Sequence, residues 1–379
     1  MKSPIWRHLF CSLVILMVLY GCHYGYTPTP TNTLPGASKT PTLIQTVTPT
    51  VISTPTPTVT SRPSITAVTS TPTATVSPSL TATIPTPTTC SSSSLQLTYI
   101  TELSSGNYGV YAIEVGNLET NFPCFGKAEL LFQTQFPIYS ITWSPNGKRV
   151  AFEGVGENNS YSIFVADWDG QNLTNITDTP EGEDAGFPVW SLDGKKIAYI
   201  YGGEIIHSHV RISDPDGKNV TQITWKDSDP NRFYWIPGSN NIAYIDYYPS
   251  RIIIGDINGT ILYQFPQDTS HFIVYIDLSF SPSGQRLVVN AEIYTEEGMP
   301  MIDLYVVNID GSGETNLTNG IGVNLAPEWS PLGDWIAYES KLDGSYNIYL
   351  IKPNGTQRIQ VTHGSNDVVQ PAWRYVGSP

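Results

Sequence analysis

A tryptophan-centred motif recurs along the C-terminal three quarters of the chain and constrains the fold more than any other feature. Its fullest copies read ITWSPNGKRVAFEG, PVWSLDGKKIAYIYG and PEWSPLGDWIAYES. Six marker aromatics lie 47, 45, 45, 49 and 44 residues apart, and they are Trp143, Trp190, Trp235, Phe280, Trp329 and Trp373. A repeat of roughly 40–45 residues with four short strands is the signature of a propeller blade. The repeat therefore predicts an all-β fold, a six-bladed β-propeller.

One repeat can be divided into strands and turns from its residues alone. Residues 138–143, 148–154, 160–167 and 171–177 alternate polar and apolar side chains. Pro-Asn-Gly and Trp-Asp-Gly turns separate them, and such Asx-Gly turns are strong hairpin signals. The pattern predicts four antiparallel strands per blade.

The first blade is expected to be divided between the two ends of the domain. Residues 106–117 align position by position with residues 344–355, so they form a third strand, and residues 97–100 form a second strand. The missing first strand is supplied by residues 371–375 at the C-terminus. This strand completes the first blade and closes the ring without an open sheet edge.

The N-terminus has the features of an export signal. Lys2 and Arg7 precede an apolar run, and Leu19–Cys22 resembles a bacterial lipoprotein cleavage box. We predict that residues 1–21 are a lipoprotein signal peptide and that Cys22 is lipidated. The alternative is an ordinary signal peptide followed by a chance cysteine. Either signal directs the chain to the extracytoplasmic side, and lipidation anchors it at the membrane, at the cell surface or in the periplasm.

Residues 22–94 contain little besides Thr, Pro and Ser and have no acidic residue. Such a segment cannot bury enough apolar surface to offset its chain entropy, so we predict a disordered stalk. The propeller is then confined to residues 95–379.

The net charge of the propeller indicates which classes of partner it can bind. All 33 acidic residues but only 15 of the 19 Lys and Arg lie beyond the stalk, so the propeller has a formal net charge of −18. This balance argues against nucleic acid and against an anionic membrane surface as ligands. Membrane contact is expected only through the lipid anchor, and the domain is expected to be a monomer.

Besides the lipidated Cys22, two cysteines remain in the mature chain, Cys90 and Cys124. Cys90 precedes the second strand of the first blade, and Cys124 lies in its enlarged connection between the third and fourth strands. Both positions fall on one face of one blade, in an oxidising compartment. We predict a Cys90–Cys124 disulfide; the alternative is two free thiols.

The WSPxGK, IAY, IYVxNxDG and LT signatures resemble those of the TolB-like (PD40, WD40-like) propeller repeat. The clearest carriers are residues 143–148, 190–195, 304–311 and 317–318. The resemblance covers almost all of residues 95–379. It implies the propeller fold and, since TolB works in a periplasmic envelope complex with a peptidoglycan-associated lipoprotein, a role in protein interactions. TolB also has a preceding α/β domain, whose place the stalk takes here. The resemblance therefore implies a TolB-like propeller and not TolB itself.

Local catalytic and metal motifs are missing from the sequence, which contains no GxSxG, HExxH or GxxxxGK[ST]. The best metal candidates are His207 and His209, which period 2 places on one face of a strand. The alternative is a pair of surface histidines, because no third ligand with fixed spacing is visible. No cofactor is expected, unless acidic loops bind a divalent cation such as calcium.

Acidic residues are concentrated in the loops opposite the cysteine face. In a closed ring these loops surround one channel mouth, so their fields add. The candidate acidic face for a ligand or cation consists of Glu181, Glu183, Asp184, Asp227, Asp229, Asp268 and Asp367. The loops between second and third strands are expected on the same face, and they carry Glu153, Glu157, Glu204, Asp246, Glu292, Glu296 and Glu297. The alternative is a solvated acidic surface that keeps an exported protein soluble.

Two classes of function remain. The first is a non-enzymatic binding propeller for an envelope or extracellular protein, peptide or glycan. The second is a propeller enzyme, of the carbohydrate lyase or hydrolase type, with a site built from scattered loops. A histidine, an arginine and paired carboxylates that converge in a deep channel would favour catalysis, whereas a shallow acidic mouth would favour binding.

Overall fold

The computed structural model describes residues 94–376, except residues 105, 121, 157, 203–207, 224–228, 247–249, 266–271, 295–300 and 343. The predicted signal peptide, the lipidated Cys22, the stalk and Cys90 lie outside the described residues. No helix in the described part of the chain is long and apolar enough to cross a membrane.

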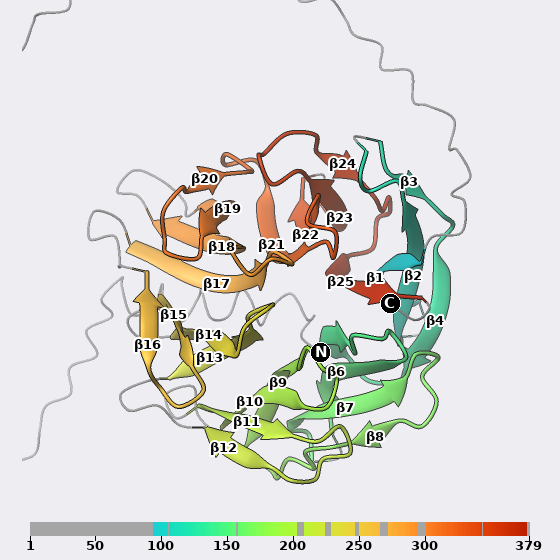
Figure 1. Ribbon diagram of the computed structural model, residues 1–379. Helices are drawn as coiled ribbons and strands as arrows, with labels where there is room; N and C mark the ends of the chain where they lie inside the picture. The colour runs from blue at the N-terminus through green and yellow to red at the C-terminus, as the bar shows by residue number, and fades with distance from the viewer. Residues whose placement is uncertain are drawn as a thin grey trace, which may run out of the picture. The chain divides into compact units, whose positions relative to one another are not determined.

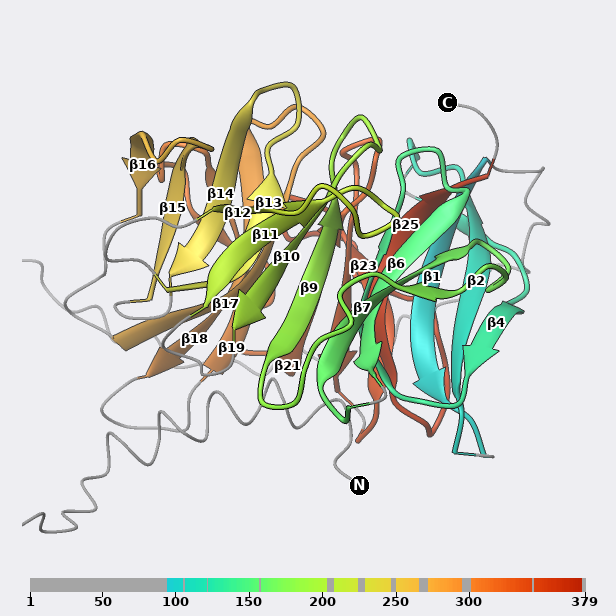
Figure 2. The ribbon, with the colours of Figure 1, turned by 90° about the horizontal axis from the view of Figure 1, so that it is seen from below.

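The described strands form six antiparallel sheets arranged as blades around a common centre (Figure 1). The first strand of each blade lies innermost, and all six run side by side around the centre (Figures 1 and 2). In blade order, these first strands are β25 (Val368–Tyr375), β5 (Ile138–Trp143), β9 (Asp184–Trp190), β13 (Pro230–Trp235), β17 (Phe272–Phe280) and β21 (Val323–Trp329). The prediction of a six-bladed propeller is confirmed.

The second and third strands of the blades are long and mostly buried. The second strands are β1 (Leu95–Glu102), β6 (Arg149–Val155), β10 (Ile197–Gly202), β14 (Asn241–Asp246), β18 (Arg286–Tyr294) and β22 (Ile336–Lys341). The third strands are β2 (Tyr108–Gly116), β7 (Tyr161–Asp167), β11 (His209–Ser213), β15 (Arg251–Asp256), β19 (Met301–Asn308) and β23 (Tyr346–Ile351).

The outer strands are short. They are β8 (Thr174–Asn175), β12 (Thr221–Ile223), β16 (Ile261–Gln264), β20 (Thr315–Asn316) and β24 (Ile359–Gln360), with β3 (Cys124–Phe125) and β4 (Glu129–Thr134) sharing this place in blade 1.

The serine of the WSPxGK motif explains why the motif recurs. In the turn after β5, the Ser144 hydroxyl accepts a hydrogen bond from the Arg149 amide at 3.0 Å, and Gly147 has a φ of 65°. The same serine-to-amide bond recurs at Ser191, Ser281 and Ser330, at 2.9–3.1 Å. The side chain thus fixes the first hairpin of each of these blades, and Gly supplies the left-handed backbone that the turn requires.

Ring closure follows the predicted route. Strand β25 pairs with β1, from Leu95 opposite Tyr375 to Thr101 opposite Val368. Blade 1 is therefore built from the two ends of the propeller sequence, and its first strand β25 is paired with its second strand β1.

Arg374 on β25 fastens this closure to blade 2. Its side chain is 6 % exposed, its Nε donates to the Gly147 carbonyl at 3.0 Å, and its Nη1 donates to Gln96 Oε1 at 2.8 Å. The guanidinium also lies 4.9 Å and 4.8 Å from the ring centroids of Trp143 and Trp168. One cation therefore connects blade 1, the first turn of blade 2 and its marker tryptophan.

Replacing Arg374 with Met should lower the free energy of unfolding by about 2–4 kcal/mol, because two buried hydrogen bonds and two cation–π contacts are lost. Urea unfolding of the full-length protein, followed by tryptophan fluorescence, measures the change. The matched control is Lys148→Met, which removes an exposed cation from the same turn and should change stability by less than about 0.5 kcal/mol. Equal unfolding midpoints for the two variants would contradict the fastening role.

Candidate functional site

A cavity of about 290 Å³ lies at the centre of the ring and is lined by residues from all six first strands. Lining positions repeat from blade to blade because the strands share one register relative to their marker aromatics. Residues three before the marker line the cavity in every blade; they are Ser140, Phe187, Arg232, Asp277, Ala326 and Gln370. Residues one before the marker also line it; they are Thr142, Val189, Tyr234, Ser279, Glu328 and Ala372.

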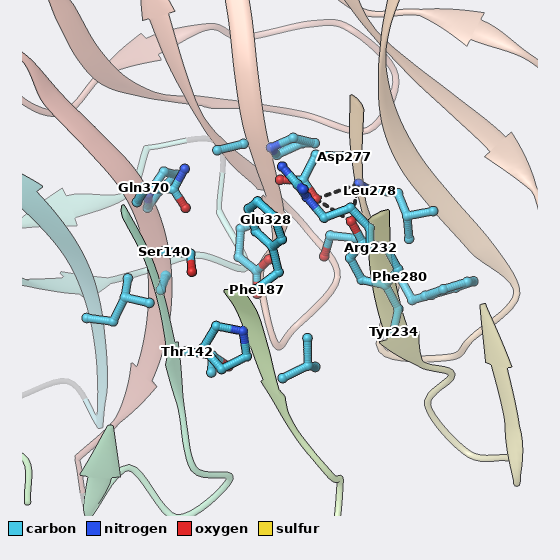
Figure 3. Close-up of a pocket in the computed structure, with 18 of the residues that line it drawn as sticks. Ser140, Thr142, Phe187, Arg232, Tyr234, Asp277, Leu278, Phe280, Glu328 and Gln370 are labelled. Atoms are coloured by element: carbon cyan, nitrogen blue, oxygen red, sulfur yellow. Dashed lines mark hydrogen bonds between the residues drawn. The ribbon is translucent and has the colours of Figure 1, made fainter. Parts of the chain in front are cut away.

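The charged side chains in these two rings come from three consecutive blades. Arg232 and Tyr234 come from blade 4, Asp277 from blade 5 and Glu328 from blade 6. Figure 3 shows Arg232, Tyr234 and Asp277 gathered on one side of the cavity, and Ser140 on the other. Charged residues therefore interrupt the repeat in one part of the cavity wall. We call Arg232, Tyr234, Asp277 and Glu328 together the charged sector.

Asp277 is held by its neighbours. Its Oδ1 accepts hydrogen bonds from the Tyr234 hydroxyl and from the Leu278 amide, the latter at 2.9 Å. Burial raises the pKa of Asp277, while the nearby charge of Arg232 and the Tyr234 hydrogen bond oppose the rise. Burial, and then the Asp277 charge, raise the pKa of Tyr234 well above its usual value, so Tyr234 remains a donor at neutral pH.

Glu328 lies in protein surroundings but keeps partial access to the cavity. Burial and, second, the charge of Asp277 raise its pKa to about 8, and a hydrogen bond with Ser279 opposes this rise. At neutral pH, Glu328 is therefore mostly protonated and can donate a hydrogen bond. The charged sector thus combines a cation, a hydrogen-bonded carboxylate and a neutral carboxylic acid.

Strand bulges lie at three of the other positions that line the cavity, those of Phe187, Ala326 and Gln370. Phe187, Ala326 and Gln370 each precede a proline, and each has a φ of 46–56°, which is uncommon for residues other than glycine. The pairing register shifts at each of these places. A bulge re-aims the side chain of the strand that contains it.

Buried glutamates of the second strands hold two of the bulges. Glu153 Oε2 accepts a hydrogen bond from the Phe187 amide at 3.1 Å, and Glu339 Oε2 accepts one from the Gln370 amide at 2.9 Å. Each glutamate belongs to the blade that precedes the bulge. These carboxyl groups therefore connect neighbouring blades and fix the wall of the cavity.

The predicted acidic face is partly used by the fold. Asp184, Asp229 and Asp367 occupy the same position, six residues before their marker tryptophans. Each accepts a hydrogen bond from a backbone amide at or next to the start of the preceding blade's third strand, at 2.9, 3.0 and 2.9 Å respectively. These carboxylates thus attach each first strand to the blade before it. Ligand or cation binding by this face stays a prediction.

The other members of the predicted face differ in their surroundings. Glu181 is exposed, and Glu183 accepts a hydrogen bond from the Tyr201 hydroxyl. Asp227 and Asp268 lie outside the described residues. The described members therefore include one carboxylate, that of Glu181, that is fully open to solvent.

Three acidic residues that were assigned to loops are instead buried within second strands. Glu153, Asp246 and Glu292 are 0, 0 and 2 % exposed and lie in β6, β14 and β18. Asp246 also forms an ion pair with Arg251, with Nη2 and Oδ2 2.7 Å apart. The expectation that they line an acidic mouth was wrong, because each lies within a second strand with its side chain almost completely buried. Glu157, Glu204, Glu296 and Glu297 lie outside the described residues.

Among the described residues, no group of three or more His, Cys, Asp or Glu side chains is arranged to hold a metal ion. His209 lies on β11 with its ring centroid 5.6 Å from that of Tyr201, and His207 lies outside the described residues. Metal binding by this pair stays a prediction.

Cys124 is disulfide-bonded and begins β3, opposite Gly116 at the end of β2. Residue 95 begins β1 at this same end of blade 1, since Gln96 pairs with Glu114. Cys90 precedes this strand by only a few residues. This arrangement supports the Cys90–Cys124 pairing, which stays a prediction because Cys90 lies outside the described residues.

The charged sector was not predicted from the sequence, although the repeat contains a signal that could have identified it. Alternate residues of a strand face one side, so the positions one and three before each marker should share the channel side of the first strand. Comparing these positions between blades would have singled out Arg232, Asp277 and Glu328 as charges that break the repeat.

Glu339 provides a test of this cavity wall through pH. Burial raises its pKa to about 8 from the usual 4.5, so the folded state keeps a proton that the unfolded state releases. Stability from this group is therefore fully present below about pH 4.5 and is lost as pH rises through about 8. Glu339→Gln removes this dependence, so the variant should become more stable relative to the wild type between pH 5 and 8, as measured by urea unfolding.

The matched variant Glu339→Ala should lose about 1–3 kcal/mol at pH 5, because the Gln370 amide loses its acceptor. Parallel curves of stability against pH for the wild type and Glu339→Gln would contradict the assignment of a buried, protonated glutamate.

Comparisons with known proteins agree with this architecture. The TolB beta propeller domain family (PD40) matches residues 200–378. Dipeptidyl-peptidase 5 of Porphyromonas endodontalis is 34 % identical over 85 residues, which are 22 % of this chain and 12 % of that protein. The chain therefore spans only a small part of that relative's length.

Two solved structures share the fold. TolB from Acinetobacter baumannii superposes with a TM-score of 0.58 and 16 % identity, over 74 % of this chain and 66 % of that one. The putative TolB from Agrobacterium tumefaciens superposes with a TM-score of 0.52 and 16 % identity, over 74 % of this chain and 98 % of that one. Together with the match to the TolB beta propeller domain family over residues 200–378, these structures show that this chain has a β-propeller fold similar to that of the TolB structures.

Proposed function

We propose that this protein is an exported lipoprotein whose propeller binds an envelope or extracellular protein, with the central cavity as the binding site. The observation that carries the proposal is the charged sector. It places a cation, a hydrogen-bonded carboxylate and a neutral carboxylic acid, from three adjacent blades, in one cavity at the centre of a rigid ring. Polar groups fixed in this way recognise a ligand without having to be ordered when it binds.

The likeness to TolB-like propellers supports a protein partner in the cell envelope. The fold is shared with two TolB structures, and the repeat resembles that of a component of an envelope complex. The predicted signal peptide, the lipidated Cys22 and the stalk supply a tether that holds the domain away from the membrane. The function proposed here is therefore display of a binding domain on a long anchor.

In this proposal the acidic loops act on the first encounter with the partner, through long-range electrostatic attraction. Residues 181–184 follow the last turn of blade 2 and include the exposed Glu181. The net charge of the propeller favours encounter with a cationic or neutral surface and disfavours an anionic one. In this proposal the loops contribute to the association rate, and the cavity contributes the specific contacts.

Filling the cavity should abolish capture of the partner. Thr142 lines the cavity and is only partly buried, so Thr142→Trp adds a large ring to the cavity wall. Full-length wild-type and variant proteins are cross-linked in envelope extracts, and the captured proteins are identified by mass spectrometry. We expect at least one protein that the wild type captures to be recovered from the Thr142→Trp variant in at least tenfold lower yield.

The control is Val220→Trp, which places the same ring at a side chain that is 49 % exposed on the outside of blade 3. It should retain the partner. Identical sets of captured proteins for Thr142→Trp and the wild type would contradict the cavity as the binding site.

A second candidate function is favoured by one observation, the pairing of Glu328 with Asp277 near Arg232. A carboxylic acid with a pKa of about 8 beside a carboxylate is suited to general acid catalysis. The enzyme candidate predicts cleavage of an anionic or neutral polysaccharide, measured as new reducing ends from polygalacturonate or starch. It also predicts at least a hundredfold loss of this activity in Glu328→Gln. We expect no cleavage by either protein, and cleavage by the wild type alone would replace the binding function.

A further inference from the structure

The guanidinium of Arg232 has more donors than the protein uses. Its side chain is 9 % exposed and lines the cavity. The guanidinium has five N–H groups. One of them, on Nη1, donates to the Asn231 carbonyl at 3.0 Å. Within the described part of the chain, Arg232 forms no ion pair. A buried cation without a paired anion is costly, so this arginine suits an anionic ligand.

The position of the guanidinium is fixed in advance. Its Cζ lies 3.3 Å from the ring centroid of Phe187, which forms a flat support for the cation. The bulge that presents Phe187 is held by Glu153, and a side chain at the adjacent Gly186 would meet the Glu153 carboxylate at 2.7 Å. The support therefore cannot shift easily, and the guanidinium stays oriented.

The nearby carboxylate of Asp277 is not an ion-pair partner of Arg232. Asp277 Oδ1 is already bonded to Tyr234 and Leu278, although its charge is close enough for each group to affect the other electrostatically. Trp235, which also lines the cavity, has a buried Nε1 with no hydrogen-bond partner among the described residues. Buried polar groups are rarely left unpaired, so the cavity wall has polar capacity for a ligand.

The charge balance selects the kind of anion. The Asp277 carboxylate lies on the same side of the cavity as Arg232 and disfavours a doubly charged group such as phosphate. A carboxylate has a single charge and a planar pair of oxygens, which match the guanidinium fork. Glu328, when protonated, can donate to the same group.

We propose that the cavity binds a peptide through a carboxylate, with Arg232 as the residue that anchors it. This inference rests on the proposed function, since it names the chemical group that the cavity recognises. A volume of about 290 Å³ admits a short terminal segment, so the C-terminal carboxylate of a partner chain fits the cavity better than a folded surface does.

The test uses two probes that differ in one group, N-acetyl-trialanine with a free C-terminal carboxylate and its C-terminal amide. Trp143, Trp235 and Trp373 line the cavity, so their fluorescence reports occupancy of the full-length protein. We expect the acid to bind at least tenfold more tightly than the amide. Arg232→Met should remove this preference, and Arg232→Lys, which keeps the charge but loses the planar fork, should retain part of it.

The matched control is Arg211→Met. Arg211 stacks on Tyr201, with Cζ 3.4 Å from the ring centroid, but does not line the cavity. This variant should keep the full preference for the acid. Circular dichroism and the unfolding midpoint of each variant establish that the fold is retained, and Arg232→Lys provides the comparison if Arg232→Met does not fold.

Three results would overturn the inference: equal affinity for the acid and the amide, binding of neither, or an unchanged preference in both Arg232 variants. None of them decides the proposed function, because partner capture by the wild type and by Thr142→Trp is measured separately. Loss of the acid preference only in the Arg232 variants supports the inference.

Discussion

Pairing of β25 with β1 is the constraint on which the rest of the structure depends. These strands come from opposite ends of the propeller sequence, and their hydrogen bonds convert a row of blades into a closed ring. Closure arranges all six first strands around one centre. Only then do equivalent positions of the six blades face a common cavity. The buried Arg374, which contacts Gly147, Gln96 and two tryptophans, fixes the closing strand in register.

Buried and partly buried acidic side chains connect many of the neighbouring blades. Asp184, Asp229 and Asp367 accept amide hydrogen bonds from the preceding blade, and Glu153 and Glu339 hold the bulges of the following one. A strongly acidic composition therefore does not by itself indicate an acidic binding surface. Side-chain acceptors are needed where a bulge or a loop leaves a backbone amide without a strand partner.

The sequence repeat was sufficient to predict the ring of blades. It was not sufficient to predict the charged side chains that line the central cavity. Spacing of the marker aromatics predicted the number of blades, the phase of the strands and the closing role of Trp373, because each depends on local turn chemistry. The charged sector depends instead on departures from the repeat. Arg232 and Asp277 occupy a position that is uncharged in the other four blades, and Glu328 occupies one that is uncharged in the other five. The positive φ at Phe187, Ala326 and Gln370 could not be predicted either, because it arises from contacts between blades.

The central claim is that a partner enters the cavity and contacts the charged sector. Its most direct test is site-specific photo-cross-linking from the full-length protein in cells, with the photoreactive residue at Thr142 in the cavity or at Leu173, which is 45 % exposed on the outside of blade 2. We predict a cross-linked partner from position 142 that disappears when Arg232 is replaced by Met, and none of the same mass from position 173. Cross-links to the same partner from position 173 alone would contradict the claim.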